Sequence, residues 1–286
     1  MQGLLSLLPS WQRALRRAEA VWLLCASRRF CATAVVFCCL SGVMIAPRAA
    51  LPDAVQRIKP SVVVVGTYQR TRSPAFVFMG TGFVVGDGTL IATNAHVRLR
   101  QPLNTEQLEM LVVAVPTKGN TGEMREVARL TVDEQHDLAL LRFKVGAPLP
   151  ALGFSSGEVR EGQSIAFTGF PIGNILGLFP TTHSGVISAI APAGIPQARA
   201  NRLDGQLIRQ LADGAFSIYQ LDAIAYPGSS GSPLFDPETG LVIGIVNSGL
   251  IRTVREAGLS DPTGITYAIP VEHLQRLIGE QRGVPR

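Results

Sequence analysis

The chain has 286 residues, of which 47% are hydrophobic and 16% charged, which is enough for a large core and a further apolar segment. Its formal net charge of +5 comes from the first 50 residues, which hold six of the 26 basic and one of the 21 acidic residues. The remainder is balanced, so we expect no nucleic acid partner. All four cysteines, at positions 25, 31, 38 and 39, lie in the same segment, which excludes a disulfide framework elsewhere. No Cys and His spacing fits a metal site, and we expect neither a metal nor a cofactor.

Residues 1–50 have the pattern of an export or membrane-anchoring segment. Residues 1–29 contain five Arg and one Glu, and the 18 residues at 30–47 are uncharged and mostly apolar, which predicts a hydrophobic helix at the short end for a membrane span. A cut after residue 49 or 50 would place Pro47 or Arg48 at a key position, so an uncleaved anchor is favoured over a cleaved signal. The Arg excess before the helix predicts that residues 51–286 lie outside the cytoplasm.

Residues 51–286 are predicted to form a β-rich domain. A short helix at 52–59 is stopped by Pro60, and a second helix is expected at 271–278. Between them lie short apolar runs separated by Gly, Pro and Asp, and a connector at 146–162 divides these runs into two sets of six. This pattern predicts an all-β fold with two six-stranded antiparallel β-barrels, at about 61–145 and about 161–270. The expected strands are 61–68, 77–85, 89–93, 108–115, 123–132, 137–143, 163–169, 181–190, 216–222, 232–236, 241–249 and 264–269.

A Gly- and Ser-rich stretch at 226–234, YPGSSGSPL, lies between two of these apolar runs. Its glycines allow the backbone angles of a tight turn, which can aim a serine hydroxyl outward and point successive N–H groups at one spot. This is the geometry of a serine nucleophile beside an oxyanion hole. Taken alone, the stretch is also compatible with an ordinary hairpin loop.

Two other stretches supply the remaining groups of such a site. His96 follows the expected strand 89–93, and Asp137 begins the strand 137–143. A serine hydroxyl needs a base within hydrogen-bond reach, and that base needs a third group to fix its tautomer. Each residue alone has a structural alternative, but the order His, Asp, Ser favours the catalytic interpretation. The neighbouring His136 and Asp133 are expected to be exposed and outside the site.

These motifs make the chain resemble a chymotrypsin-fold serine protease of the HtrA/Deg type. The family usually has Asn where Ser229 stands and Gly where Ser232 stands, and these departures affect the oxyanion loop but no catalytic side chain. The resemblance covers residues 52–278. It is carried by the segments 80–85 (GTGFVV), 93–97 (TNAHV), 137–141 (DLALL), 169–171 (GFP), 183–188 (HSGVIS), 222–223 (DA), 227–234 (PGSSGSPL), 244–247 (GIVN) and 267–270 (YAIP).

The resemblance implies a site between the two barrels, with Ser230 as nucleophile, His96 as general base and Asp137 as the residue that orients the base. The backbone N–H groups of Gly228 and Ser230 would form the oxyanion hole. The segment before the nucleophile and the end of a later strand would form the substrate pocket, through Ile224, Val246, Asn247 and Ser248. None of these four side chains is charged, so we expect small to medium aliphatic side chains, and not Arg or Lys, before the cut.

The implied function is that of a serine endopeptidase acting on unfolded or signalling polypeptides at the periplasmic face of a bacterial inner membrane. Residues 30–47 would anchor it, with an exported, cleaved and soluble periplasmic form as the alternative. The alternative function is a catalytically silent, membrane-anchored binding or chaperone-like module. Many relatives are trimers and carry PDZ domains; a homotrimer is therefore suggested, whereas no PDZ domain is expected after residue 278. The insertion at 191–215 is expected to be a surface helix or, as in the family, a regulatory loop.

Overall fold

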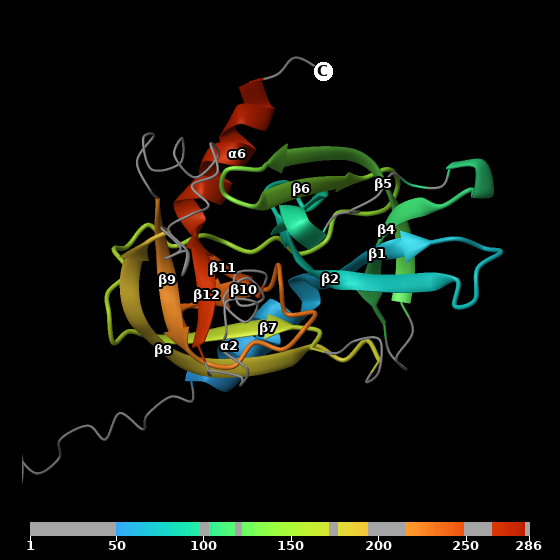
Figure 1. The fold of residues 1–286 in the computed structure, drawn as a ribbon. Helices are drawn as coiled ribbons and strands as arrows, with labels where there is room; N and C mark the ends of the chain where they lie inside the picture. The colour runs from blue at the N-terminus through green and yellow to red at the C-terminus, as the bar shows by residue number, and fades with distance from the viewer. Residues whose placement is uncertain are drawn as a thin grey trace, which may run out of the picture. The chain divides into compact units, whose positions relative to one another are not determined.

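The computed structural model describes residues 50–97, 103, 105–117, 122–171, 177–193, 216–248 and 265–283. It contains two closed, six-stranded antiparallel β-barrels, preceded by helix α2 and followed by helix α6 (Figure 1). This architecture confirms the expected fold class. The hydrophobic helix predicted at 30–47 and residues 194–215 of the insertion lie outside the described residues.

The first barrel closes in the strand order β1-β2-β3-β6-β5-β4. Its interior is filled mainly by β-branched side chains such as Val63, Val84 and Ile91, which suit the pleated surface of a strand. The strands of this barrel are β1 (Val62–Tyr68), β2 (Phe76–Val85), β3 (Leu90–Asn94), β4 (Met110–Pro116), β5 (Gly122–Asp133) and β6 (Leu138–Phe143).

The second barrel closes in the order β10-β11-β12-β9-β8-β7 around a core that includes Phe167, Leu221 and Ile243. The strand expected at 232–236 is shorter, because the Ser232 N–H donates to the Ser229 carbonyl at 3.1 Å and so still belongs to the preceding turn. The strands are β7 (Ser164–Gly169), β8 (Thr181–Pro192), β9 (Ser217–Asp222), β10 (Pro233–Phe235), β11 (Val242–Asn247) and β12 (Ile265–Pro270).

A shared apolar core holds the two barrels together. Successive side chains of β6 alternate between faces, so Leu141 packs inside the first barrel whereas Leu138 and Leu140 face the shared core. There they meet Ile245 of β11 and Leu274 of α6 (Val271–Gly283). Burying each such side chain contributes about 1.5–3 kcal/mol, so the docking is well defined. Asp137 directly precedes β6, and its position is therefore tied to the second barrel.

A second cluster also spans both barrels. Helix α2 (Ala50–Ile58) buries Ala54 and Ile58 against Val64 of β1 and Phe235 of β10. The helix ends before a 3₁₀ turn at Lys59–Ser61 that contains Pro60, as expected for a proline that cannot continue a helix.

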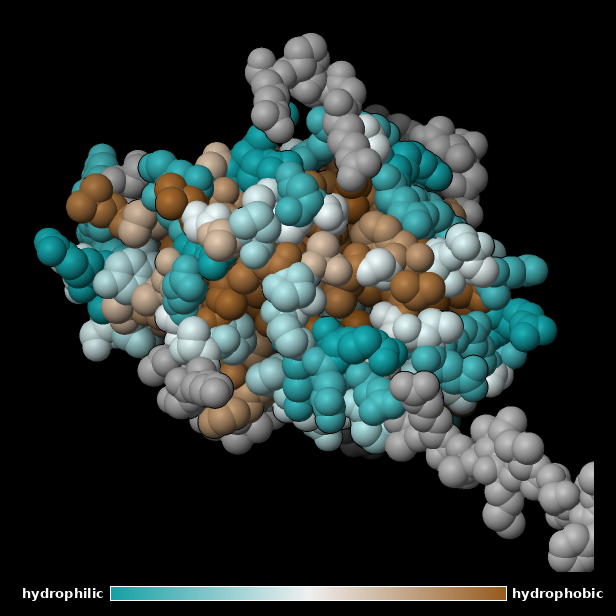
Figure 2. All heavy atoms as spheres, turned by 180° about the vertical axis from the view of Figure 1, so that it is seen from behind, coloured by the Kyte–Doolittle hydropathy of each residue, from teal (hydrophilic) through white to brown (hydrophobic). Residues whose placement is uncertain are grey.

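The back of the molecule shows apolar residues mainly in the middle of the face, surrounded by polar ones (Figure 2). Within the described part of the chain, no helix combines the length and apolar character needed to cross a membrane.

Candidate active site

His96 lies in a one-turn 3₁₀ helix (Ala95–Val97) directly after β3. Two hydrogen bonds to the main-chain carbonyl of Asp137 fix this turn. The Ala95 N–H donates to that oxygen at 3.0 Å, and the side-chain Nδ2 of Asn94 donates to it at 3.2 Å. The His96 N–H donates to Asp137 Oδ1 at 2.8 Å. Asp137 therefore holds the backbone that carries His96 as well as contacting the His96 ring.

Asp137 ends the turn between β5 and β6 with a φ of +52°. This left-handed conformation is rare for residues other than Gly, Asn and Asp. Its Oδ2 lies 2.6 Å from His96 Nδ1 and accepts a hydrogen bond from Asn247 Nδ2 at 2.7 Å. Because an ionised carboxylate can only accept, His96 carries its proton on Nδ1 and leaves the Nε2 lone pair free to accept.

Ser230 Oγ lies 2.9 Å from that Nε2 atom, so the structure brings together the three residues predicted as the catalytic triad. The loop that carries Ser230 is bonded to β2 of the other barrel, since the Thr81 N–H donates to the Ser230 carbonyl at 2.9 Å. Thr81 Oγ1 also donates to the Gly228 carbonyl at 2.7 Å. Gly231 has a φ of +85°, and a Cβ there would overlap the Thr81 carbonyl oxygen, so the turn requires glycine.

The amides around Ser230 are used selectively. The Ser229 N–H donates to the Tyr226 carbonyl at 3.0 Å, and the Gly231 N–H donates to the Val246 carbonyl at 2.9 Å. Among the residues that the structure describes, the Gly228 and Ser230 N–H groups have no backbone acceptor. These are the two amides that the family resemblance implies for the oxyanion hole, and that role stays a prediction.

The four predicted pocket residues lie in different surroundings. Ile224 is 48% exposed, whereas Val246 is buried in the core of the second barrel. Asn247 bonds to Asp137, and Ser248 contacts Ser230 through both its hydroxyl and its N–H. Their role in binding substrate stays a prediction.

Sequence reasoning missed the support that polar side chains give to the site. The family resemblance implies a pocket position for Asn247, but Asn247 is the last residue of an otherwise apolar strand, where a polar residue indicates a buried partner. Thr266 Oγ1 donates to the Ala223 carbonyl at 2.5 Å and accepts from the Ala225 N–H at 2.9 Å. It therefore fixes the main chain on both sides of Ile224.

His183 packs against the loop that follows Ile224, through the ring of Tyr226. Its ring stacks on Phe167, with centroids 5.1 Å apart, and lies 5.9 Å from the ring of Tyr226. Burial lowers the pKa of His183, so at neutral pH it packs as an uncharged ring.

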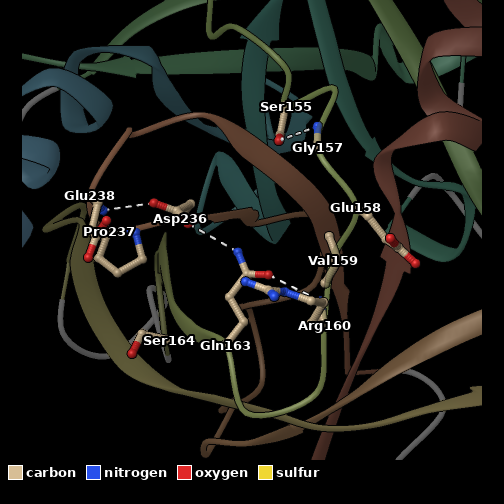
Figure 3. Close-up of a pocket in the computed structure, with 10 residues that line it drawn as sticks. All are labelled: Ser155, Gly157, Glu158, Val159, Arg160, Gln163, Ser164, Asp236, Pro237 and Glu238. Atoms are coloured by element: carbon tan, nitrogen blue, oxygen red, sulfur yellow. Dashed lines mark hydrogen bonds between the residues drawn. The ribbon is translucent and has the colours of Figure 1, made fainter.

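A separate cavity of about 380 Å³ lies between the connector and the β10–β11 turn (Figure 3). Its polar groups bond mainly to one another: Gln163 Nε2 donates to Asp236 Oδ2 at 3.0 Å, and the Arg160 N–H donates to Gln163 Oε1 at 3.2 Å. None of the three triad residues lines it. Across the described residues, no group of His, Cys, Asp and Glu side chains is arranged to hold a metal ion.

Comparison with known proteins gives one family match, to the trypsin-like peptidase domain, at residues 80–245. The chain is 28% identical over 236 residues to "Serine protease HTR4" of Bos taurus, covering 80% of this chain and 41% of that protein. It is 28% identical over 234 residues to "Serine protease HTRA1A" of Danio rerio (80% and 41% covered). It is 29% identical over 242 residues to "Serine protease HTRA2, mitochondrial" of Bos taurus (81% and 43% covered). The chain thus spans about two-fifths of the length of these relatives.

Proposed function

The chain belongs to the trypsin-like peptidase family, and on that premise we propose that it is a serine endopeptidase that hydrolyses peptide bonds in polypeptides. The similarity to HtrA serine proteases, which the motifs predicted, extends over about 80% of the chain. The observation that carries the proposal is the continuous series of hydrogen bonds from Asp137 through His96 to Ser230.

In the first half of the reaction, Ser230 Oγ attacks the carbonyl carbon of the scissile bond while its proton passes to His96 Nε2. Asp137 stabilises the imidazolium that forms, and the Gly228 and Ser230 N–H groups bind the oxygen that becomes negative. When the C–N bond breaks, His96 returns the proton to the leaving amine. The polypeptide's new N-terminus departs, and Ser230 is left as an acyl ester.

In the second half, a water molecule gives its proton to His96 and attacks the ester carbon. The same two N–H groups hold the oxyanion. Collapse of this intermediate releases the carboxylic acid and returns the proton from His96 to Ser230 Oγ. The residues needed come from both barrels, so the activity requires both to be folded and docked.

The setting proposed for this reaction is the periplasmic face of a bacterial inner membrane, with unfolded or signalling proteins as substrates. The basic and apolar pattern of residues 1–47 supports membrane anchorage. The family resemblance supports a homotrimer. Fractionation of cells that express the full chain, and sedimentation of the purified protein, test the location and the trimer separately.

The experiment that tests the activity is labelling of the folded chain with a fluorophosphonate, followed by mapping of the modified residue. We expect modification of Ser230 and none in Ser230→Ala. Ser184→Ala serves as the matched control, because Ser184 is an exposed serine on β8, and it should label like the parent. A folded parent chain that does not label at Ser230 would favour the catalytically silent binding module instead.

A further inference from the structure

The end of β11 contacts two members of the triad through successive residues. Asn247 Nδ2 donates to Asp137 Oδ2 at 2.7 Å, as described above. The next residue, Ser248, contacts the nucleophile twice: its hydroxyl is hydrogen-bonded to Ser230 Oγ, and its N–H donates to the same oxygen at 3.2 Å. The nucleophile therefore has more partners than the imidazole alone.

The direction of these hydrogen bonds follows from the His96 tautomer. A serine hydroxyl has one proton and two acceptor lone pairs. The Ser230 proton lies toward His96 Nε2, so in the contact between the two hydroxyls Ser248 is the donor. Both lone pairs of Ser230 Oγ then accept hydrogen bonds from Ser248, one from its N–H and one from its O–H. An oxygen in this state has no lone pair free to attack a carbonyl carbon.

The two donors differ in freedom. The Ser248 N–H is fixed by the main chain at the end of β11, whereas the hydroxyl can rotate about one bond. Ser230 itself is only 5% exposed, so solvent offers few alternative partners for its oxygen. The hydroxyl is thus the donor that can be withdrawn when the reaction begins.

We propose that Ser248 is a positioning residue that holds Ser230 in the resting enzyme, and that its hydroxyl must turn away before Ser230 attacks. This role rests on the proposed function. A polypeptide whose main chain runs along the end of β11 offers carbonyl groups that can accept the Ser248 hydroxyl, so an extended substrate assists the release. A small reagent that reaches only Ser230 does not.

This difference in substrate size defines the experiment. The full chain and its variants are treated with diisopropyl fluorophosphate, and the second-order rate of Ser230 modification is measured across pH. Removal of one hydrogen bond from the nucleophile should make Ser248→Ala react about fivefold faster, with an unchanged pH midpoint. Hydrolysis of a long unfolded polypeptide should show no such gain in kcat/KM, because the variant also loses the hydroxyl that donates to a carbonyl group of that substrate.

Ser248→Thr and Ser248→Val form a matched pair of nearly equal size that differs in the hydroxyl. The threonine variant should react with the reagent at the parental rate, and the valine variant should be as fast as Ser248→Ala. If Ser248→Ala does not fold, the threonine and valine variants still test the role of the hydroxyl. Ser184→Ala should match the parent.

Equal or slower reaction of Ser248→Ala and Ser248→Val would overturn the role of Ser248, as would a shifted pH midpoint, which indicates a disturbed His96. If the parent chain itself shows no modification of Ser230, the proposed function fails and the role of Ser248 fails with it. The two failures are therefore distinguishable.

Discussion

Two Asp–His pairs stand next to each other in this chain, and their geometry is almost the same. His96 Nδ1 lies 2.6 Å from Asp137 Oδ2, and His136 Nδ1 lies 2.6 Å from Asp133 Oδ2. In both pairs the main-chain N–H of the histidine also donates to the other carboxylate oxygen, at 2.8 Å for His96 and 3.1 Å for His136. Bond lengths alone do not separate a candidate catalytic pair from a structural one.

The surroundings separate them. The side chains of His96 and Asp137 are 29% and 31% exposed, whereas that of His136 is 8% exposed. The far side of His96 meets Ser230, but His136 stacks on His273 with centroids 4.0 Å apart and meets Phe216 edge-on. The expectation that His136 is exposed is wrong, because His273 of α6 and Phe216, the residue before β9, cover it. An Asp–His pair becomes useful for catalysis when its outer nitrogen meets a nucleophile and substrate can reach it.

The largest expected effect comes from removing the hydrogen bond between His96 and Ser230. Ser230→Ala should lower the rate of casein hydrolysis about 10³–10⁶-fold while the fold is retained, and His96→Ala should do nearly as much. His136→Phe keeps a ring against His273 and should cost far less. Activity assays with circular dichroism as a folding control check this. Activity that survived in Ser230→Ala and vanished in Ser229→Ala or Ser232→Ala would show that the nucleophile is misassigned.

A smaller effect is expected at Asn247, the third donor to the Asp137 carboxylate, which comes from the other barrel. Asn247→Leu removes the 2.7 Å hydrogen bond to a carboxylate, and hydrogen bonds to charged groups contribute about 1.5–3 kcal/mol. We expect kcat to fall about 10–100-fold with little change in KM, because the orientation of His96 and not substrate binding is disturbed. Steady-state kinetics on a peptide substrate measures both constants. A rise in KM with an unchanged kcat would instead place Asn247 in the substrate pocket, as the sequence suggested.

The second pair, Asp133 and His136, packs against His273, and this contact should make the stability of the fold depend on pH. Burial, together with the electrostatic effect of His136 and Arg276, lowers the pKa of His273 to about 4, although nearby Asp133 acts in the opposite direction. Histidine in an unfolded chain titrates near 6.5, so between these values the unfolded state binds more protons. The contribution of neutral His273 to stability is therefore present above about pH 6.5 and is lost as the pH falls toward 4.

We expect this loss to be roughly 1–3 kcal/mol, since one pKa unit is worth about 1.4 kcal/mol and partial access of water reduces the effect. Urea unfolding at neutral and mildly acidic pH measures it. His273→Phe preserves the stacking but cannot titrate, so its stability should depend less on pH than that of the parent. Part of the dependence should remain, because burial lowers the pKa of His183 in the same direction. An unchanged pH dependence in His273→Phe contradicts the assignment.

The barrels, and the three side chains of His96, Asp137 and Ser230 that lie together, could be predicted because their signals are local. Short apolar runs separated by Gly and Pro specify strands, and the LALL run at 138–141 is apolar throughout because this part of β6 is buried on both faces. The contacts of Asn247, Ser248 and His136 could not be predicted, since each depends on how β11 or α6 docks against the other barrel. Helix α6 is also longer than predicted: it continues from the expected end at residue 278 to Gly283, over a stretch of sequence that has no apolar pattern.

The smallest effect concerns the predicted substrate pocket, in which Ile224 would contact the side chain before the cut. Ile224 is 48% exposed and held in place by the two Thr266 hydrogen bonds that flank it. An apolar side chain there offers no partner to a cation, and an unpaired buried charge is strongly disfavoured, so Arg and Lys before the cut should be rejected. Among apolar residues, one methylene changes the barrier by only about 1–3 kcal/mol, so Val, Ala and Leu should all be accepted, with Phe and Tyr less favoured. Profiling of cleavage sites in a denatured protein mixture measures the preference. Ile224→Asp should shift it toward Arg and Lys, whereas Ile224→Val should leave it aliphatic; a dominant Arg or Lys signal in the parent chain would show that Ile224 does not form the pocket.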